Sequence, residues 1–107
     1  MVKLYLDDIR DPKDPGFIVV RSYEEAVSFV LENGAPDYIS FDHDLGIDPG
    51  VIEKTGYDFA KWLVEADMDG KIDIPIHFRF NVHSANPIGA SNIESYLKNY
   101  LRSKLGV

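Results

Sequence analysis

The chain has 107 residues, 45% of them hydrophobic, with 11 basic and 18 acidic side chains and no cysteine. This length predicts a single domain, residues 1–107, built around one core. The lack of cysteine excludes a disulfide framework, thiol catalysis and a thiolate metal site, and it makes a cytoplasmic location the default expectation. The net charge of −7 opposes broad nucleic-acid binding. No stretch has the pattern of a signal peptide or of a membrane span.

The first third of the chain predicts two strands and a helix. Residues 2–6 are mostly apolar and end abruptly in aspartates, and residues 17–20 form a second apolar run after a turn-rich connection. This connection is too short to hold a full crossover helix. The string SYEE then predicts a capping box, with Ser22 as the N-cap and Glu25 at N3, at the start of an amphipathic helix that Gly34 closes.

The middle of the chain predicts a buried strand, a long loop and a second helix. Residues 37–41 read as the strand, and the loop 42–54 that follows is rich in Asp, Gly and Pro and long enough to carry a site. Thr55 and Asp58 have the spacing of a helix cap, and apolar side chains recur at helical spacing from there to about Asp67.

The last third predicts a strand and a helix, which together with the earlier elements define the fold class. Residues 74–82 alternate between apolar and polar side chains, so one face of this strand must tolerate water or a ligand. A final helix is expected from about Ser91. Alternating strands and helices predict an α/β three-layer sandwich with a mainly parallel four-stranded sheet. In such sheets, ligands bind beyond the carboxyl ends of the strands.

Acidic side chains follow two of these strands at the point where each strand ends. Asp7 and Asp8 follow the first strand, and Asp42 follows the third. If the three carboxylates converge, their oxygens suit Mg²⁺ or Mn²⁺, and they would repel one another without a cation. The alternative is that these aspartates cap loops and never meet.

Two histidines flank the same predicted edge of the sheet. His43 follows Asp42, and His83 follows the fourth strand, so each is a candidate for proton transfer or for a packing role beside the site. The alternating run places His77 six residues before His83, roughly 20 Å away at ~3.3 Å per residue, so His77 is expected to be structural.

Three further side chains are candidates for phosphate binding. Ser84 and Asn86 offer hydroxyl and amide donors, although Asn86 can instead cap a helix that begins at Pro87. Arg10 can clamp a phosphate with two hydrogen bonds, or can only pair with Asp11 or Asp14 on the surface. The spacing of the tyrosines predicts no base-stacking platform.

The order of these motifs resembles that of response-regulator receiver domains. The segments that carry the resemblance are FIVVRSYEEAVSFVLENGAPDYISFDHDLG, TGYDFAKWL and IHFRFNVHSANP. The resemblance implies a truncated receiver-like, flavodoxin-like fold in which Asp7 and Asp8 hold Mg²⁺, Asp42 is the phosphoacceptor, Asp44 offers its carbonyl to the metal and Ser84 is the switch hydroxyl. The chain departs from that pattern in its nearly absent first helix, its missing fifth strand and its missing phosphate-contacting lysine.

A divergent branch matches more closely. YLDDIR, SFDHDLG, TGYD and HSANPIG resemble the cyclic-phosphate processing receiver-like family over nearly the whole chain. This resemblance implies a small phosphorylated substrate, either a cyclic nucleotide or the 2′,3′-cyclic phosphate end of an RNA.

The predicted function is therefore a metal-dependent phosphoesterase that opens a cyclic phosphodiester. In this hypothesis one of His43 and His83 is the base and the other the acid, while Arg10, Ser84 and Asn86 position the phosphate. Covalent attack by Asp42 is an open alternative. The competing hypothesis is a non-catalytic receiver-derived domain that binds a phosphorylated ligand or a protein partner.

Overall fold

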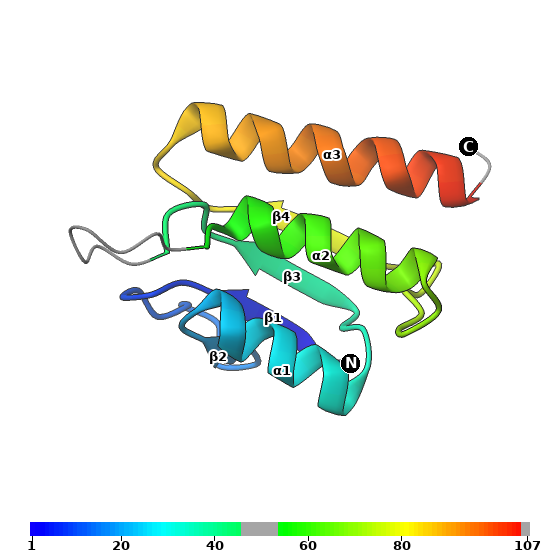
Figure 1. Cartoon of the computed structure of the whole chain (residues 1–107). Coiled ribbons are helices and arrows are strands. Elements are labelled where there is room, and N and C mark those ends of the chain that lie inside the picture. Colours follow the sequence, from blue (N-terminus) through cyan, green and yellow to red (C-terminus); the bar gives the residue numbers. More distant parts are fainter. Residues whose placement is uncertain (46–53, 106–107) are drawn as a thin grey trace.

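Four short strands pair in parallel to form one sheet in the computed structural model, which describes residues 1–45 and 54–105 (Figure 1). The strand order is β2-β1-β3-β4. Their bounds are Lys3–Leu6 for β1, Ile18–Val20 for β2, Tyr38–Phe41 for β3 and Arg79–Val82 for β4. The predicted α/β fold with a parallel four-stranded, receiver-like sheet is confirmed.

Three helices accompany this sheet within the described residues, and two of them begin at the predicted caps. They are α1 (Tyr23–Asn33), α2 (Gly56–Met68) and α3 (Pro87–Leu105). The Ser22 hydroxyl accepts a bond from the first turn of α1, and Thr55 and Asp58 form the complete capping box of α2. At α1 the box is incomplete, because the Glu25 carboxylate accepts from the backbone N–H of Arg21 instead of that of Ser22.

The hydrophobic core lies on one face of the sheet. Leu4, Leu6, Ile39 and Phe41 are fully buried there, and they pack with apolar side chains of all three helices in one cluster. Figure 1 shows the helices as a row, with α2 between α1 and α3. The opposite face meets the β1–β2 connection, residues 7–17, so this connection takes the place of the third layer of the predicted sandwich.

Two predicted boundaries are wrong. β4 is shorter than the predicted strand 74–82. The Phe78 N–H donates to the Pro75 carbonyl and closes a turn there, and the pairing of β4 with β3 begins only at Arg79, opposite Tyr38. α3 starts at Pro87 and not near Ser91, because Asn86 caps it, which is the alternative that the sequence offered for this residue.

The carboxyl ends of β1, β3 and β4 meet at one edge of the sheet. Leu6 pairs with Phe41, and Phe41 with Val82, so the residues after each strand emerge side by side. Most of the predicted functional loop 42–54 lies outside the described residues. No helix within the described part of the chain has the length and apolar character needed to cross a membrane.

Candidate functional site

The three predicted acidic residues converge at this edge. Asp7 and Asp42 directly follow the adjacent strands β1 and β3, and the Asp42 N–H donates to the Leu6 carbonyl at 2.9 Å. One carboxylate oxygen from each of Asp7, Asp8 and Asp42 lies within 4.8 Å of the others. We call these three residues the acidic centre. Such a set of hard oxygen donors has the composition of a Mg²⁺ or Mn²⁺ site.

Asp7 is fully buried and accepts four hydrogen bonds. Its Oδ1 accepts from the backbone N–H groups of Ile9 and Arg10 at 3.0 and 2.8 Å. Its Oδ2 accepts from Arg10 Nε at 2.8 Å and from His83 Nε2 at 3.0 Å. Burial raises the pKa of the Asp7 carboxyl, but these bonds and the Arg10 charge outweigh burial and bring it below its ordinary value. Asp7 is therefore an ionised acceptor.

Asp42 has the opposite electrostatic balance. Burial, followed by the charge of Asp7, raises the pKa of Asp42 above its ordinary value. Arg10 and His83 offset this effect only in part, although Arg10 Nη2 lies 3.5 Å from the Asp42 carboxylate. The charge of Asp42 is thus compensated only in part, which favours a further cation beside it.

Arg10 lies between the acidic residues and not on the surface with Asp11 or Asp14. Those two aspartates pair with other cations, Asp11 with Arg21 and Asp14 with Lys3. Arg21 also donates to the carbonyl of Arg10 at 2.7 Å, which supports the turn after β1. The expected alternative of a surface pair for Arg10 is therefore wrong, and its guanidinium faces the acidic centre.

His83 connects the acidic centre to β3. Because the Asp7 carboxylate can only accept, His83 Nε2 carries a hydrogen, and a neutral ring then accepts at Nδ1 from the Ser40 hydroxyl at 2.7 Å. The imidazole stacks on Tyr5, with ring centroids 4.4 Å apart and planes 4° apart. Both ring nitrogens are thus engaged, and the ring is held in one orientation.

His43 is oriented differently. Its Nδ1 bonds to Asp44 at 2.8 Å, which leaves Nε2 without a partner among the described residues. The Asp44 carboxylate is exposed and is not part of the acidic centre. His77 pairs with Asp37, which precedes β3, so it lies at the amino end of the sheet as the sequence predicts.

Two glycines position the segment that carries Asp42 and His43. A Cβ on Gly56 would lie 1.8 Å from the Asp42 carbonyl oxygen, and a Cβ on Gly89 would lie 2.4 Å from Cγ of the His43 ring. Only glycine therefore allows the N-termini of α2 and α3 to approach this segment so closely. The TGYD and NPIG strings contain both glycines, but sequence reasoning gave them no such role.

Ser84 and Asn86 contribute to the start of α3. The Ser84 hydroxyl accepts from the Asn86 N–H at 3.1 Å, and the Asn86 side-chain oxygen accepts from the Gly89 N–H at 3.0 Å. The capping role of Asn86 is confirmed. Phosphate binding by Ser84 or Asn86 stays a prediction. Sequence reasoning also missed Tyr5 and Ser40, which contact His83 only because the strand register brings them together.

The parallel sheet with acidic side chains at its carboxyl end defines a receiver-like α/β domain. More particularly, the family model of the cyclic-phosphate processing receiver domain matches residues 2–99, so the chain belongs to that family. The family description associates this domain with cyclic-phosphate processing. No curated protein and no solved structure matches the chain.

Proposed function

We propose that this chain is a metal-dependent phosphoesterase that opens cyclic phosphodiesters, either cyclic nucleotides or the 2′,3′-cyclic phosphate ends of RNA. The observation that carries the proposal is the convergence of Asp7, Asp8 and Asp42 within 4.8 Å at the carboxyl end of the sheet. Membership of the cyclic-phosphate processing receiver family supports the choice of substrate class.

The acidic centre suits Mg²⁺ or Mn²⁺ in donor type and in charge. Asp7, Asp8 and Asp42 would hold the ion, and by the receiver resemblance Asp44 would add its backbone carbonyl. The raised pKa of Asp42, caused by burial and then by Asp7, supports this fit because Arg10 and His83 offset these two effects only in part. When bound, such an ion polarises a phosphoryl oxygen and makes a nearby water more acidic.

In the proposal, His43 moves the protons and His83 is a positioning residue. Water adds its oxygen to phosphorus, one ester P–O bond of the ring breaks, and the released alkoxide takes up a proton. The bond between Asp44 and Nδ1 orients the His43 ring and leaves its Nε2 to take a proton from the attacking water and to give it to the alkoxide. Both ring nitrogens of His83 are engaged in hydrogen bonds. The Ser40 hydroxyl holds the ring at Nδ1, and the ring holds the Asp7 carboxylate through Nε2.

Arg10 and the start of α3 would hold the phosphate. The Arg10 side chain is about half exposed, at 47%, while its guanidinium reaches both Asp7 and Asp42. Backbone N–H groups at a helix N-terminus favour anions, and Ser84 and Asn86 lie at that end of α3. Asp42 acts here as a metal ligand; a covalent role would appear as labelling of Asp42 by a small phosphodonor.

The test is hydrolysis of 3′,5′-cyclic, 2′,3′-cyclic and linear nucleotides with and without Mn²⁺. We expect turnover of cyclic substrates only with the metal, and a loss of roughly 10²–10⁴-fold for His43→Gln. The matched control is His77→Gln, which removes a histidine at the opposite end of the sheet and should leave turnover unchanged. Tight binding without turnover would contradict the enzyme and support the non-catalytic binding domain.

A further inference from the structure

A pocket of about 480 Å³ opens on the face of the sheet opposite the helical core. Its floor is formed by side chains that alternate with the core residues, namely Tyr5 on β1 and Tyr38 and Ser40 on β3. The β1–β2 connection forms a wall through Phe17. A volume of this size falls in the range of about 300–1,000 Å³ typical of small-molecule sites.

The apolar part of this pocket is aromatic. Phe17 meets Tyr5 edge-to-face with ring centroids 5.6 Å apart, and it meets Tyr38 in the same way at 5.8 Å. These three rings come from distant parts of the chain, which is why their spacing predicts no platform. Aromatic surfaces of this kind bind flat heterocycles such as nucleobases by stacking.

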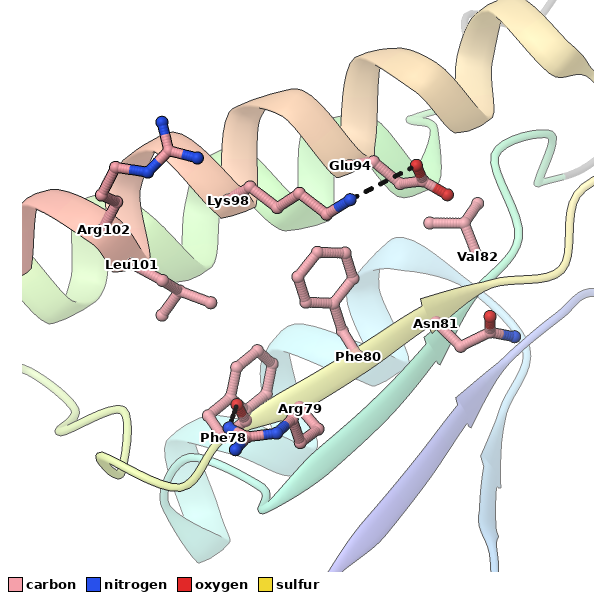
Figure 2. Close-up of a pocket in the computed structure, with 9 residues that line it drawn as sticks. All are labelled: Phe78, Arg79, Phe80, Asn81, Val82, Glu94, Lys98, Leu101 and Arg102. Carbon is pink, nitrogen blue, oxygen red and sulfur yellow. Dashed lines mark hydrogen bonds and ion pairs between the residues drawn. The ribbon is translucent and has the colours of Figure 1, made fainter. Parts of the chain in front are cut away.

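The polar part of the pocket suits the edge of a base. Asn81 on β4 is exposed and lines the pocket, and its amide can both donate and accept hydrogen bonds. Figure 2 shows Asn81 pointing to the opposite side of β4 from Phe80 and Val82. The pocket therefore combines stacking surfaces with a side chain that can pair with a base.

The pocket is continuous with the acidic centre. Arg10 and His83 both line it, and both also donate to the Asp7 carboxylate, at 2.8 and 3.0 Å. A phosphate bound beside Asp7 and Asp42 would therefore have its organic substituent directed past the stacked rings of His83 and Tyr5 and along the open face of the sheet toward Tyr38.

We propose that this pocket binds the nucleoside part of a nucleoside cyclic phosphate whose phosphate lies at the acidic centre. The proposal rests on the proposed function and adds the place where the base of its substrate binds, on the face of the sheet opposite the helical core. The hollow between α3 and β4 in Figure 2 is a poorer candidate: it lies on the helical face, and Asp7, Asp42, Arg10 and His83 do not line it.

The experiment compares three probes on the whole chain in Mn²⁺. They are adenosine 2′,3′-cyclic phosphate, adenosine 3′,5′-cyclic phosphate and glycerol 1,2-cyclic phosphate, which has no base. We measure kcat/KM for each probe that is turned over and Kd for each that is not, and we map contacts by backbone amide NMR. The kcat/KM or the affinity of at least one adenosine probe should exceed that of the glycerol probe by about fivefold to 100-fold. Amide shifts should appear at Tyr5 and Tyr38, which line this pocket and not the hollow between α3 and β4.

Variants separate the base from the phosphate. Tyr38→Ala should lower the kcat/KM or affinity of the adenosine probe to that of the glycerol probe, whose own value should not change. Tyr38→Phe keeps the ring and should therefore keep the preference for adenosine. Arg102→Ala, in the hollow of Figure 2, is the matched control and should change neither probe. Thermal unfolding of each variant confirms that it is folded.

The outcomes distinguish the two proposals. Equal use of the adenosine and glycerol probes, unaffected by Tyr38→Ala, would overturn the nucleoside pocket and leave the phosphoesterase standing. Amide shifts confined to α3 around Lys98 and Arg102 would overturn it as well. If no probe binds or turns over, both proposals fail.

Discussion

Single residues hold the candidate site through contacts that tolerate little change. The His43 ring packs against the first turn of α3, where a Cβ on Gly89 would lie 2.4 Å from Cγ and 2.5 Å from Cδ2 of the ring. Atoms that close cannot coexist, so any larger residue at position 89 must displace the ring or the helix. The position of His43 relative to Asp42 therefore depends on a residue with no side chain.

Gly89→Ala should destabilise the protein by about 1–3 kcal/mol, because it overpacks the contact with His43. The same change in a His43→Ala background should be neutral or stabilising by up to about 1 kcal/mol, because alanine is the better helix former. Urea denaturation of the four proteins of this cycle measures both effects. An equal loss of stability in both backgrounds would show that the ring contact is not the cause.

The acidic residues of the site could be predicted from the sequence, but the hydrogen bonds that support them could not. Asp7 and Asp42 follow neighbouring parallel strands, and such strands end at the same edge whatever their register. The bond between Ser40 and His83, by contrast, joins residues 43 positions apart and depends on the register of β3 against β4. No local pattern in the sequence encodes that register.

At the scale of elements, Asp67 joins the end of α2 to α3. Its carboxylate is nearly buried, with 4% of the side chain exposed, and it accepts from the Tyr100 hydroxyl and from Lys104 Nζ at 2.8 Å. The Ile74 N–H donates to it as well, at 2.8 Å. Burial raises the pKa of Asp67, but the bonds from Lys104, Tyr100 and Ile74 outweigh burial and bring it below its ordinary value. Burial and the bond to Asp67 raise the pKa of Tyr100 to about 12.

Asp67→Asn should lower the free energy of unfolding at pH 7 by about 2–4 kcal/mol, because it leaves Lys104 without its buried partner. A carboxyl with a lowered folded-state pKa stabilises the fold above its unfolded value, about pH 4, and this contribution is lost as pH falls further. The difference in free energy of unfolding between the wild type and Asp67→Asn, measured by urea denaturation, should therefore shrink from pH 7 to pH 3. Asp73→Asn, which removes an exposed partner of Lys104, should change little at either pH. A gap that does not depend on pH would contradict the ionic role of Asp67.

Element boundaries were predictable where local chemistry sets them. Ser22, Thr55 and Gly34 mark ends of α1 and α2 because caps satisfy the free backbone groups within a turn of the helix. The start of β4 depends instead on the length of its partner β3 and on the turn at Pro75, so the alternating pattern from residue 74 extends beyond the paired segment.

At the scale of the whole molecule, one core on one face of the sheet supports an acidic edge. Folding brings Asp7, Asp8 and Asp42 together in a chain whose net charge is already −7. Gathering these charges costs free energy. Burial of the core on the helical side offsets this cost, since side chains such as Leu4 and Phe41 are fully buried there. A cation that binds only the folded acidic centre must then stabilise the entire domain.

Mg²⁺ or Mn²⁺ at 100 times its Kd should stabilise the protein by about 2.7 kcal/mol, which in a domain of this size raises Tm by on the order of 10 °C. Asp42→Asn should remove this response. In EDTA at neutral pH, Asp42→Asn should also raise Tm by itself, because an acid whose pKa is raised by folding disfavours the fold once it is ionised. The wild type should therefore lose stability relative to Asp42→Asn as pH rises through the pKa of Asp42.

Thermal unfolding in EDTA, in Mn²⁺ and in KCl of equal ionic strength measures these shifts, since KCl reports screening alone. Asp44→Asn is the matched control: its exposed carboxylate lies outside the acidic centre, so the Mn²⁺ shift should persist in this variant. A Mn²⁺ shift that KCl reproduces, or that survives in Asp42→Asn, would show that the acidic centre binds no divalent cation. Arg10 would then be the cation that offsets the charges of Asp7 and Asp42, and His83 would hold Asp7 by its hydrogen bond.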